Sequence, residues 1–211
     1  AIAFITVKLV EYLKNLVIKA YEVRKEFSQY EAVLKNTLGT QEAAADSMKR
    51  LQKLATDTPY SLKEWTEGYI KLINRGIKPT NEELINMGDI AASQGKTLEQ
   101  FIEALLDAMT GENERLKEFG IRANAQGDKV KYTFKGVTTE VEKTDTAIVN
   151  YILSLGKLQG AQDSMAVQMN ELAGMQSNLG DSADNLFNKI GKRLEPFFKR
   201  VLGTTAVFIE D

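Results

Sequence analysis

The chain has 211 residues, of which 43% are hydrophobic and 27% are charged. This apolar content is sufficient for a folded core, so the composition excludes a disordered tail. Positive and negative residues nearly cancel to a formal net charge of −2. Because no long run of one sign occurs, the sequence gives no indication of a nucleic-acid or anionic-lipid partner.

Cysteine and histidine are both absent from the sequence. Their absence excludes disulfide bonds, thiolate metal sites and the Ser-His and Cys-His pairs of common hydrolases. We therefore expect a protein that is not an enzyme, with no catalytic residue, no cofactor-binding residue, no metal ligand and no cofactor.

The two ends of the sequence indicate a piece of a longer protein. It begins with Ala1 instead of methionine, and it ends shortly after the apolar run Val207–Ile209. The apolar opening, residues 1–7, is followed by Lys8 and Lys14, well short of the roughly 20 apolar residues that a membrane-spanning helix needs. We therefore expect neither a signal peptide nor a membrane anchor there.

Residues 1–38 are predicted to form one long amphipathic helix. Apolar residues recur at alternating steps of four and three, the heptad signature of a seam that meets another helix. The seam residues are Leu9, Leu13, Leu16, Ala20, Val23, Phe27, Tyr30 and Leu34. Such a helix would be on the order of 55 Å long and would project from a compact domain. We expect its seam to pair either with a second copy or with the chain's own segment between Leu158 and Leu194.

Residues 39–143 are predicted to form a cluster of short helices with an inserted β-hairpin. Thr40 precedes an alanine-rich helix that runs to about Ala55. Three further helices begin at capping boxes, in which two side chains three residues apart satisfy free amides of the first turn. The pairs are Ser61 with Glu64, Thr80 with Glu83 and Thr97 with Gln100, and the helices are expected to end near Gly76, Gly95 and Gly111.

Residues 121–142 are predicted to form the hairpin, because apolar and polar side chains alternate on both sides of Lys135–Gly136. A two-residue turn there fixes the register. It pairs Val130 with Val141, Tyr132 with Thr139 and Phe134 with Val137 on one face, and Lys131 with Glu140 and Lys129 with Glu142 on the other. A turn at Gln126–Asp128 would add residues 121–125 as a third strand.

Residues 144–211 are predicted to form a long interrupted helix, or several helices. The helical period returns at about Thr144, and Gly156, Gly160 and Pro196 interrupt it. Pro196 is expected to kink or end the last segment. The predicted fold is thus mainly α, with long amphipathic helices flanking a small helical cluster that carries a two- or three-stranded antiparallel β-hairpin insertion.

Five segments, taken in order, resemble the N-terminal region of phage tail tape measure proteins. The family has five recurring segments, and each has a counterpart here. They are a TPF/Y start with a glycine-ended helix, an LGDIA helix with a Gly-Lys loop, an L-EFGI segment, a TFKGV segment and an NL-DS tail. The counterparts are Thr58–Leu62 with Leu72–Ile77, Met87–Ala92 with Gln94–Leu98, Leu116–Ile121, Val130–Val137, and Asn178–Ser182 with Leu194–Pro196. The resemblance begins near residue 30, and residues 1–29 carry no motif of the family.

The resemblance implies a structural tail component that sets tail length, occupies the lumen of the tail tube and is released at infection to aid DNA delivery. The partners it implies are further copies of the chain (a trimer is one arrangement), the tail tube protein, tail tip or baseplate proteins and tail assembly chaperones. It also implies contact with the host envelope on ejection, and no specific nucleic acid. The expected locations are the tail lumen of the virion and, during assembly, the host cytoplasm.

Two alternative functions are a cell-wall-cleaving domain and a membrane-active translocation domain of a larger tail protein. Glu112, Glu114 and Glu118 could supply the carboxylates of a glycosidase, although their spacing is typical of a solvated helix face. Gly156 and Gly160 form a small-xxx-small pair that lets helices approach closely in lipid, although Lys157 lies between them.

Other residue patterns have both a functional and a packing interpretation. Met165, Met169 and Met175 could form an adaptable partner surface, and Trp65 with Tyr69 could form a recognition surface. We expect both groups to pack in the core instead. Gly127 and Gly136 lack the spacing of a phosphate-binding loop and are expected to be turn residues.

Overall fold

The computed structural model describes the backbone of residues 2–207 and the side chains of residues 14–171 and 179–200. Within these ranges the fold is mainly helical and contains a three-stranded antiparallel sheet, as the sequence predicts. The elements are α1 (Ile2–Leu38), α2 (Gln41–Asp57), α3 (Leu62–Asn74), α4 (Asn81–Ser93), α5 (Leu98–Met109), the 3-10 turn η1 (Arg115–Phe119), β1 (Ile121–Gln126), β2 (Lys129–Phe134), β3 (Val137–Glu142), α6 (Asp145–Ser154), the 3-10 turn η2 (Leu155–Lys157), α7 (Ser164–Met169) and α8 (Leu172–Val207).

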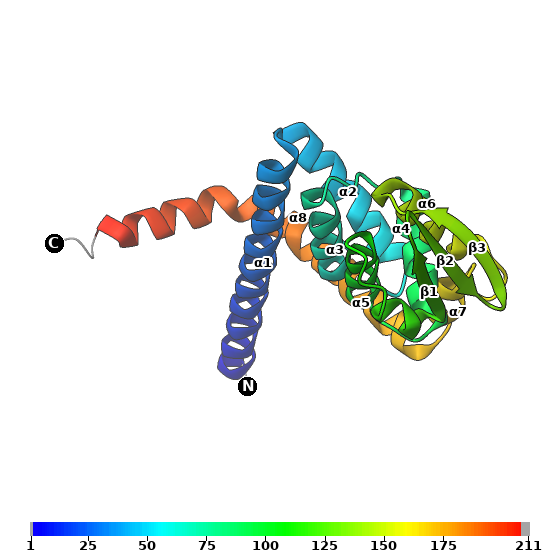
Figure 1. Ribbon diagram of the computed structural model, residues 1–211. Coiled ribbons are helices and arrows are strands. Elements are labelled where there is room, and N and C mark those ends of the chain that lie inside the picture. Colours follow the sequence, from blue (N-terminus) through cyan, green and yellow to red (C-terminus); the bar gives the residue numbers. More distant parts are fainter. Residues whose placement is uncertain (1, 208–211) are drawn as a thin grey trace.

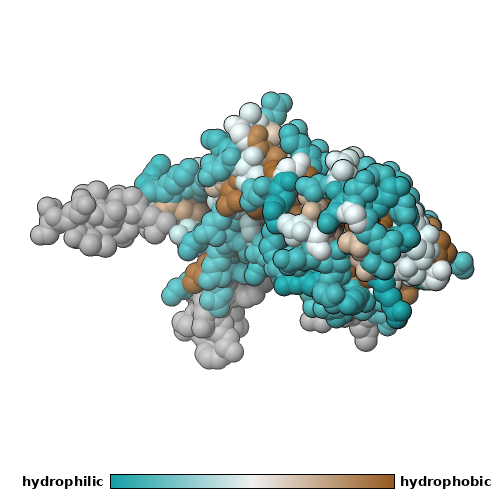
Figure 2. Space-filling view, viewed as in Figure 1, coloured by the Kyte–Doolittle hydropathy of each residue, from teal (hydrophilic) through white to brown (hydrophobic). Residues whose placement is uncertain are grey.

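Helices α2 to α7 and the sheet form a compact body, from which α1 and the C-terminal part of α8 project (Figure 1). The core of this body contains large side chains that are almost completely buried, including Trp65, Phe101, Phe119 and Tyr132. The face shown in Figure 2 is mostly hydrophilic over the body. The body is therefore an ordinary helical core with a small sheet at one end.

Local signals determine where the short helices begin. The three predicted capping boxes are all present, at Ser61, Thr80 and Thr97. The Thr40 side chain accepts a hydrogen bond from the backbone N–H of Ala43 and caps α2 in the same way. Each cap satisfies amides that the helix itself leaves free, so these helix starts are encoded by neighbouring residues alone.

The predicted strand register is also confirmed. β2 pairs with β3 so that Val130 faces Val141 and Lys131 faces Glu140, and β1 adds the third strand on the other side of β2. On the expected buried face, Val130, Tyr132, Phe134 and Val141 are buried, whereas Val137, which is 66% exposed, and Thr139 are exposed. The difference arises because β3 is an edge strand, which neighbouring elements cover less completely than the central strand β2.

The seam of α1 is covered by the chain itself over the second half of the helix. Ala20, Val23, Phe27 and Leu34 are buried, and α1 packs against α2, α3 and α8. Leu16 and Tyr30 are half-buried, and the side chains of Leu9 and Leu13 lie outside the described ones. From Ala20 onward the intramolecular alternative is therefore the one that the structure adopts.

Helices α1 and α8 cross at Gly191. A Cβ atom built on Gly191 would lie 2.6 Å from the carbonyl oxygen of Ala20 and 2.6 Å from Cβ of Arg24, so a glycine is needed for this close approach. Arg24 Nε pairs with Glu195 Oε2 at 3.1 Å, and Lys192 pairs with Glu31 at 3.5 Å. The crossing is thus close and flanked by charged pairs.

Of the two expected effects of Pro196, a kink or an end of the helix, α8 excludes the end. It continues from Leu172 to Val207, and Pro196 lies inside it without ending it. A proline removes one backbone hydrogen bond, and water can bond the freed carbonyl because Pro196 is exposed. The interruptions fall earlier, where η2 and α7 separate α6 from α8.

Candidate functional site: the motif junction

Two of the five segments that resemble tape measure proteins, Thr58–Leu62 and Met87–Ala92, meet in the core. Together with Trp65 and Met165 they form a group of buried residues, called here the motif junction: Thr58, Tyr60, Trp65, Gly88, Asp89 and Met165. They come from the loop before α3, from α3 itself, from α4 and from α7. All six residues are buried in the body. The junction joins parts of the chain that are far apart in sequence.

Hydrogen bonds connect the loop before α3 to the helices on both sides of it in sequence and to α4. The Thr58 hydroxyl donates to the carbonyl of Leu54 at 2.7 Å and accepts from the Trp65 indole N–H at 2.9 Å. The Tyr60 hydroxyl lies 3.3 Å from the carbonyl oxygen of Gly88 and 3.2 Å from that of Lys96, to which it donates. Thr58 and Tyr60 therefore connect α2, α3, the middle of α4 and the loop that follows α4.

Burial perturbs the titration of Tyr60. Its pKa is raised above the ordinary tyrosine value, first by burial and then by the nearby carboxylates Glu64 and Asp89. The ring also packs edge to face on Trp65, with centroids 5.9 Å apart. Tyr60 is thus a neutral hydrogen-bond donor at physiological pH and has no feature of a catalytic base.

Asp89 of α4 caps the start of α7, which lies more than 70 residues later in the sequence. Its side chain is 4% exposed, and its two oxygens accept the backbone N–H groups of Asp163 at 3.1 Å and Met165 at 2.9 Å. Burial raises the pKa of Asp89, while the hydrogen bonds from Met165 and Asp163 lower it. The carboxylate therefore supports the start of α7 and, through it, the approach to α8.

Two glycines permit close packing beside Asp89. A Cβ on Gly88 would overlap the side chain of Met165 and lie 3.3 Å from Trp65. A Cβ on Gly156 would lie 2.6 Å from the carbonyl oxygen of Asn86. Of the Gly156 and Gly160 pair, only Gly156 makes a close approach inside the body, whereas Gly160 is exposed beside the Lys135 side chain. No described helix is long and apolar enough to cross a membrane.

A carboxylate of α8 docks at the start of α3. Asp181 Oδ1 accepts the backbone N–H of Leu62 at 3.4 Å, next to the Ser61 cap. Burial raises the pKa of Asp181, and Asp184 and Glu64 raise it further. The NL-DS segment is therefore also used to join helices.

Aromatic and methionine residues that allowed two interpretations belong to the packing. Trp65 is fully buried, and Tyr69 is buried with the Arg50 guanidinium 5.0 Å from its ring centroid. Met165 is buried and Met169 is half-buried, whereas the Met175 side chain lies outside the described ones.

The three candidate carboxylates are not brought together. Glu118 pairs with Lys96, with Nζ 2.6 Å from Oε2, and Glu114 pairs with Lys117. Glu112 and Glu114 line one surface hollow, and Glu118 lines another. The hydrogen bond from Lys96 lowers the pKa of Glu118, whereas a glycosidase acid needs a raised pKa. This arrangement favours the interpretation as a solvated surface.

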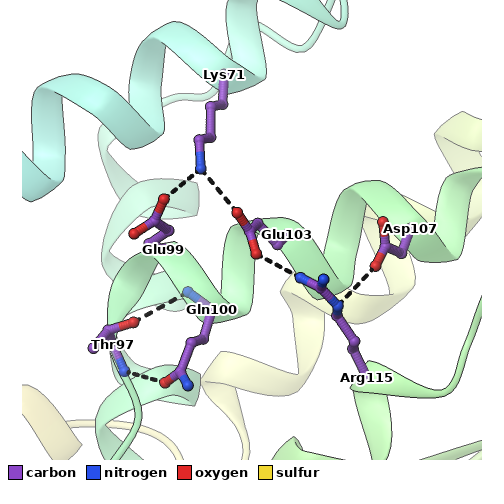
Figure 3. Close-up of polar contacts among 7 residues, drawn as sticks. All are labelled: Lys71, Thr97, Glu99, Gln100, Glu103, Asp107 and Arg115. Carbon is purple, nitrogen blue, oxygen red and sulfur yellow. Dashed lines mark hydrogen bonds and ion pairs between the residues drawn. The ribbon is translucent and has the colours of Figure 1, made fainter.

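A network of ion pairs on the surface was not predicted from the sequence (Figure 3). Lys71 of α3 pairs with Glu99 at 2.6 Å and with Glu103 at 3.0 Å, both on α5. Arg115 continues the network to Glu103 and to Asp107. Lys71 and then Arg115 lower the pKa of Glu103. The network links α3, α5 and η1, but exposed pairs of this kind contribute little stability individually.

A hollow of about 260 Å³ adjoins the motif junction between α2, α4 and α7. Its lining includes Arg50, Lys53, Asp57, Asp89 and Asp163, so both signs of charge are present. Among the described residues, no group of three or more acidic side chains is arranged to hold a metal ion. The hollow therefore has no feature that defines a reaction.

The fold and the junction define a structural helical module in which the shared motifs serve packing. The sequence profile of the family described as "Tape measure protein" matches residues 19–192, which is most of the chain. The chain belongs to the tape measure protein family. No curated protein and no solved structure matches it.

Proposed function

We propose that this chain is a folded module of a phage tail tape measure protein that sets tail length, occupies the lumen of the tail tube and is released at infection to aid DNA delivery. Family membership over residues 19–192 carries the proposal. The motif junction supports it, because the motif residues hold helices together instead of forming a reactive site. Extended helical segments elsewhere in the protein would act as the ruler, since each helical residue adds about 1.5 Å of length.

We further infer that the module assembles in the host cytoplasm and lies in the tail lumen of the virion. Its proposed partners are the tail tube protein, tail tip or baseplate proteins, tail assembly chaperones and, on ejection, the host envelope. A homo-oligomer such as a trimer is also proposed. It would have to use surfaces other than the α1 seam from Ala20 to Leu34, because that part of the seam is buried within the chain.

The tail-length function is tested in the phage by changing the full-length protein outside residues 19–192. A helical insertion of about 28 residues in an extended segment is expected to lengthen the tail by about 42 Å in electron micrographs. A deletion of the same size is expected to shorten the tail equally. Tails of unchanged length in both variants would overturn the proposal.

We also propose that the module does not hydrolyse peptidoglycan, because Glu112, Glu114 and Glu118 do not converge on one site. Purified protein is expected to leave the turbidity of a cell-wall suspension unchanged. Clearing that depends on these residues, and that the Glu112→Gln, Glu114→Gln, Glu118→Gln triple variant loses, would favour the cell-wall-cleaving alternative instead.

A further inference from the structure

Helix α8 leaves part of its apolar surface uncovered in the described part of the chain. Among its described side chains, residues 179–200, the buried positions are Asn188 and Gly191, and neither is apolar. Asn188 is 4% exposed and its Oδ1 has no hydrogen-bond partner, as is also true of Asp181 Oδ2. Phe187, Leu194 and Phe198 are half-buried; Phe187 packs against the core and Phe198 against Tyr21 of α1. An amphipathic helix normally buries its apolar side, whereas α8 carries apolar side chains on an exposed face as well.

Four exposed apolar side chains of α8 form a stripe on the face opposite Asn188. Its members are Leu179, Leu186, Ile190 and Phe197, which are 73%, 58%, 39% and 58% exposed. At 3.6 residues per turn they project from the side opposite Asn188. We call this surface the outer stripe. Four large apolar side chains aligned on one exposed face indicate a surface that is covered by a partner.

Basic side chains lie along one edge of the outer stripe. Lys189 and Arg193 are exposed and one helical turn apart, and within the described residues neither has an ion-pair partner. The acidic residues of α8 are on the body side, where Asp184 pairs with Lys19 and Glu195 pairs with Arg24. The charge beside the stripe is therefore uncompensated and positive.

The geometry distinguishes between possible occupants. The steps of seven, four and seven residues are those of a narrow coiled-coil seam, whereas a helix lying on a lipid surface needs a broader apolar face. A second copy of α8 in register is disfavoured, because Arg193 falls within its own seam and would meet another Arg193. An amphipathic helix that carries carboxylates can pack its apolar side chains on the stripe and pair its carboxylates with the basic edge.

We propose that the outer stripe binds an amphipathic helix of another protein, whose apolar seam is flanked by acidic residues. Apolar side chains of that helix pack on Leu186 and Ile190, and its carboxylates pair with Lys189 and Arg193. This inference goes beyond the proposed function, because setting tail length requires no such surface.

The probes for the test are two synthetic helical peptides with the same heptad of leucines, one flanked by glutamates and the other by lysines. Binding to the chain is measured by fluorescence anisotropy at low and at moderate salt. The glutamate peptide is expected to bind about tenfold more tightly than the lysine peptide, with a preference that salt reduces. The charge reversals Lys189→Glu and Arg193→Glu together should abolish or invert this preference.

Two further variants make the test specific. Leu186→Ser with Phe197→Ser should weaken binding of the glutamate peptide at least about tenfold, while circular-dichroism melts remain unchanged because both side chains are exposed. Lys78→Glu with Lys143→Glu changes the charge by the same amount on exposed residues of segments that do not contact α8, and should preserve the preference.

Three outcomes would overturn the proposal. The first is equal affinity of the native chain for the two peptides, or no binding of either. The second is an oligomer in sedimentation velocity that the Leu186→Ser, Phe197→Ser variant dissolves, which would identify a second copy as the occupant. The third is co-sedimentation with phosphatidylglycerol vesicles that the same variant loses while the glutamate peptide does not bind, which would identify a lipid surface.

Discussion

Asp89 is the residue whose role depends most on the tertiary structure. The sequence places it in the helix that begins at the Thr80 capping box, and nothing nearby in the sequence indicates what its carboxylate would bind. The structure supplies two backbone N–H groups, from Asp163 and Met165, that lie more than 70 residues away. A buried carboxylate is tolerated when such donors satisfy it.

Replacing Asp89 with Asn is expected to destabilise the protein by about 1–3 kcal/mol, because one of its two acceptors becomes a donor that faces an N–H group. Asp163→Asn is the control, since Asp163 has φ of 61° and is exposed, and Asn tolerates that conformation well. Urea denaturation measures both variants. Equal stabilities would show that the Asp89 hydrogen bonds do not support α7.

The hairpin of β2 and β3 is the element that was most completely predictable. Its two faces differ in polarity and its turn is short, so a slip by one residue would exchange the faces. In the structure Lys129 pairs with Glu140 at 2.8 Å, and Lys131 lies 3.9 Å from the same carboxylate. Both the register and the charged outer face follow from neighbouring residues.

Val130→Lys is expected to destabilise the protein by about 3 kcal/mol, because it places an unpaired charge at a position that is 1% exposed. Val137→Lys is the matched control on the paired strand and should be nearly neutral, as should exchanging Lys131 with Glu140. Thermal melts compare the three. If Val130→Lys and Val137→Lys had equal effects, the assignment of the buried face would be wrong.

Longer elements were less predictable than the hairpin. The capping boxes fixed the starts of α3, α4 and α5 because each uses side chains three residues apart. The continuation of α8 through Pro196 depends on packing against α1 and α2, which no local pattern specifies. The heptad seam of α1 was visible in the sequence, but its partner could not be chosen because several helices offered a matching face.

The two long helices α1 and α8 project from the body and pack against each other (Figure 1). The seam of α1 turns toward the body from Ala20 to Leu34, and the charged residues at the α1–α8 crossing hold the two helices at Gly191. In the described part of the chain, Val17, Ile18 and Tyr21 on α1 are exposed, as is the outer stripe of α8.

Val23→Glu is therefore expected to destabilise the folded monomer by about 3 kcal/mol, because Val23 is 3% exposed. Leu16→Glu should have a smaller effect, since Leu16 is only half-buried. Chemical denaturation measures the free energy of unfolding, and analytical ultracentrifugation of the same samples measures the oligomeric state. An oligomer that Val23→Glu dissolves, with no loss of monomer stability, would place this part of the seam in an intermolecular interface.

We infer that this chain is a compact module of a tape measure protein and not part of its ruler. Tail length in phages that carry an insertion between Lys135 and Gly136, at the exposed turn between β2 and β3, tests it most directly. With about 28 inserted residues we predict a tail of native length, because the turn lies off the axis along which helices would add length. A tail longer by about 42 Å, or about 1.5 Å for each inserted residue, would contradict the claim.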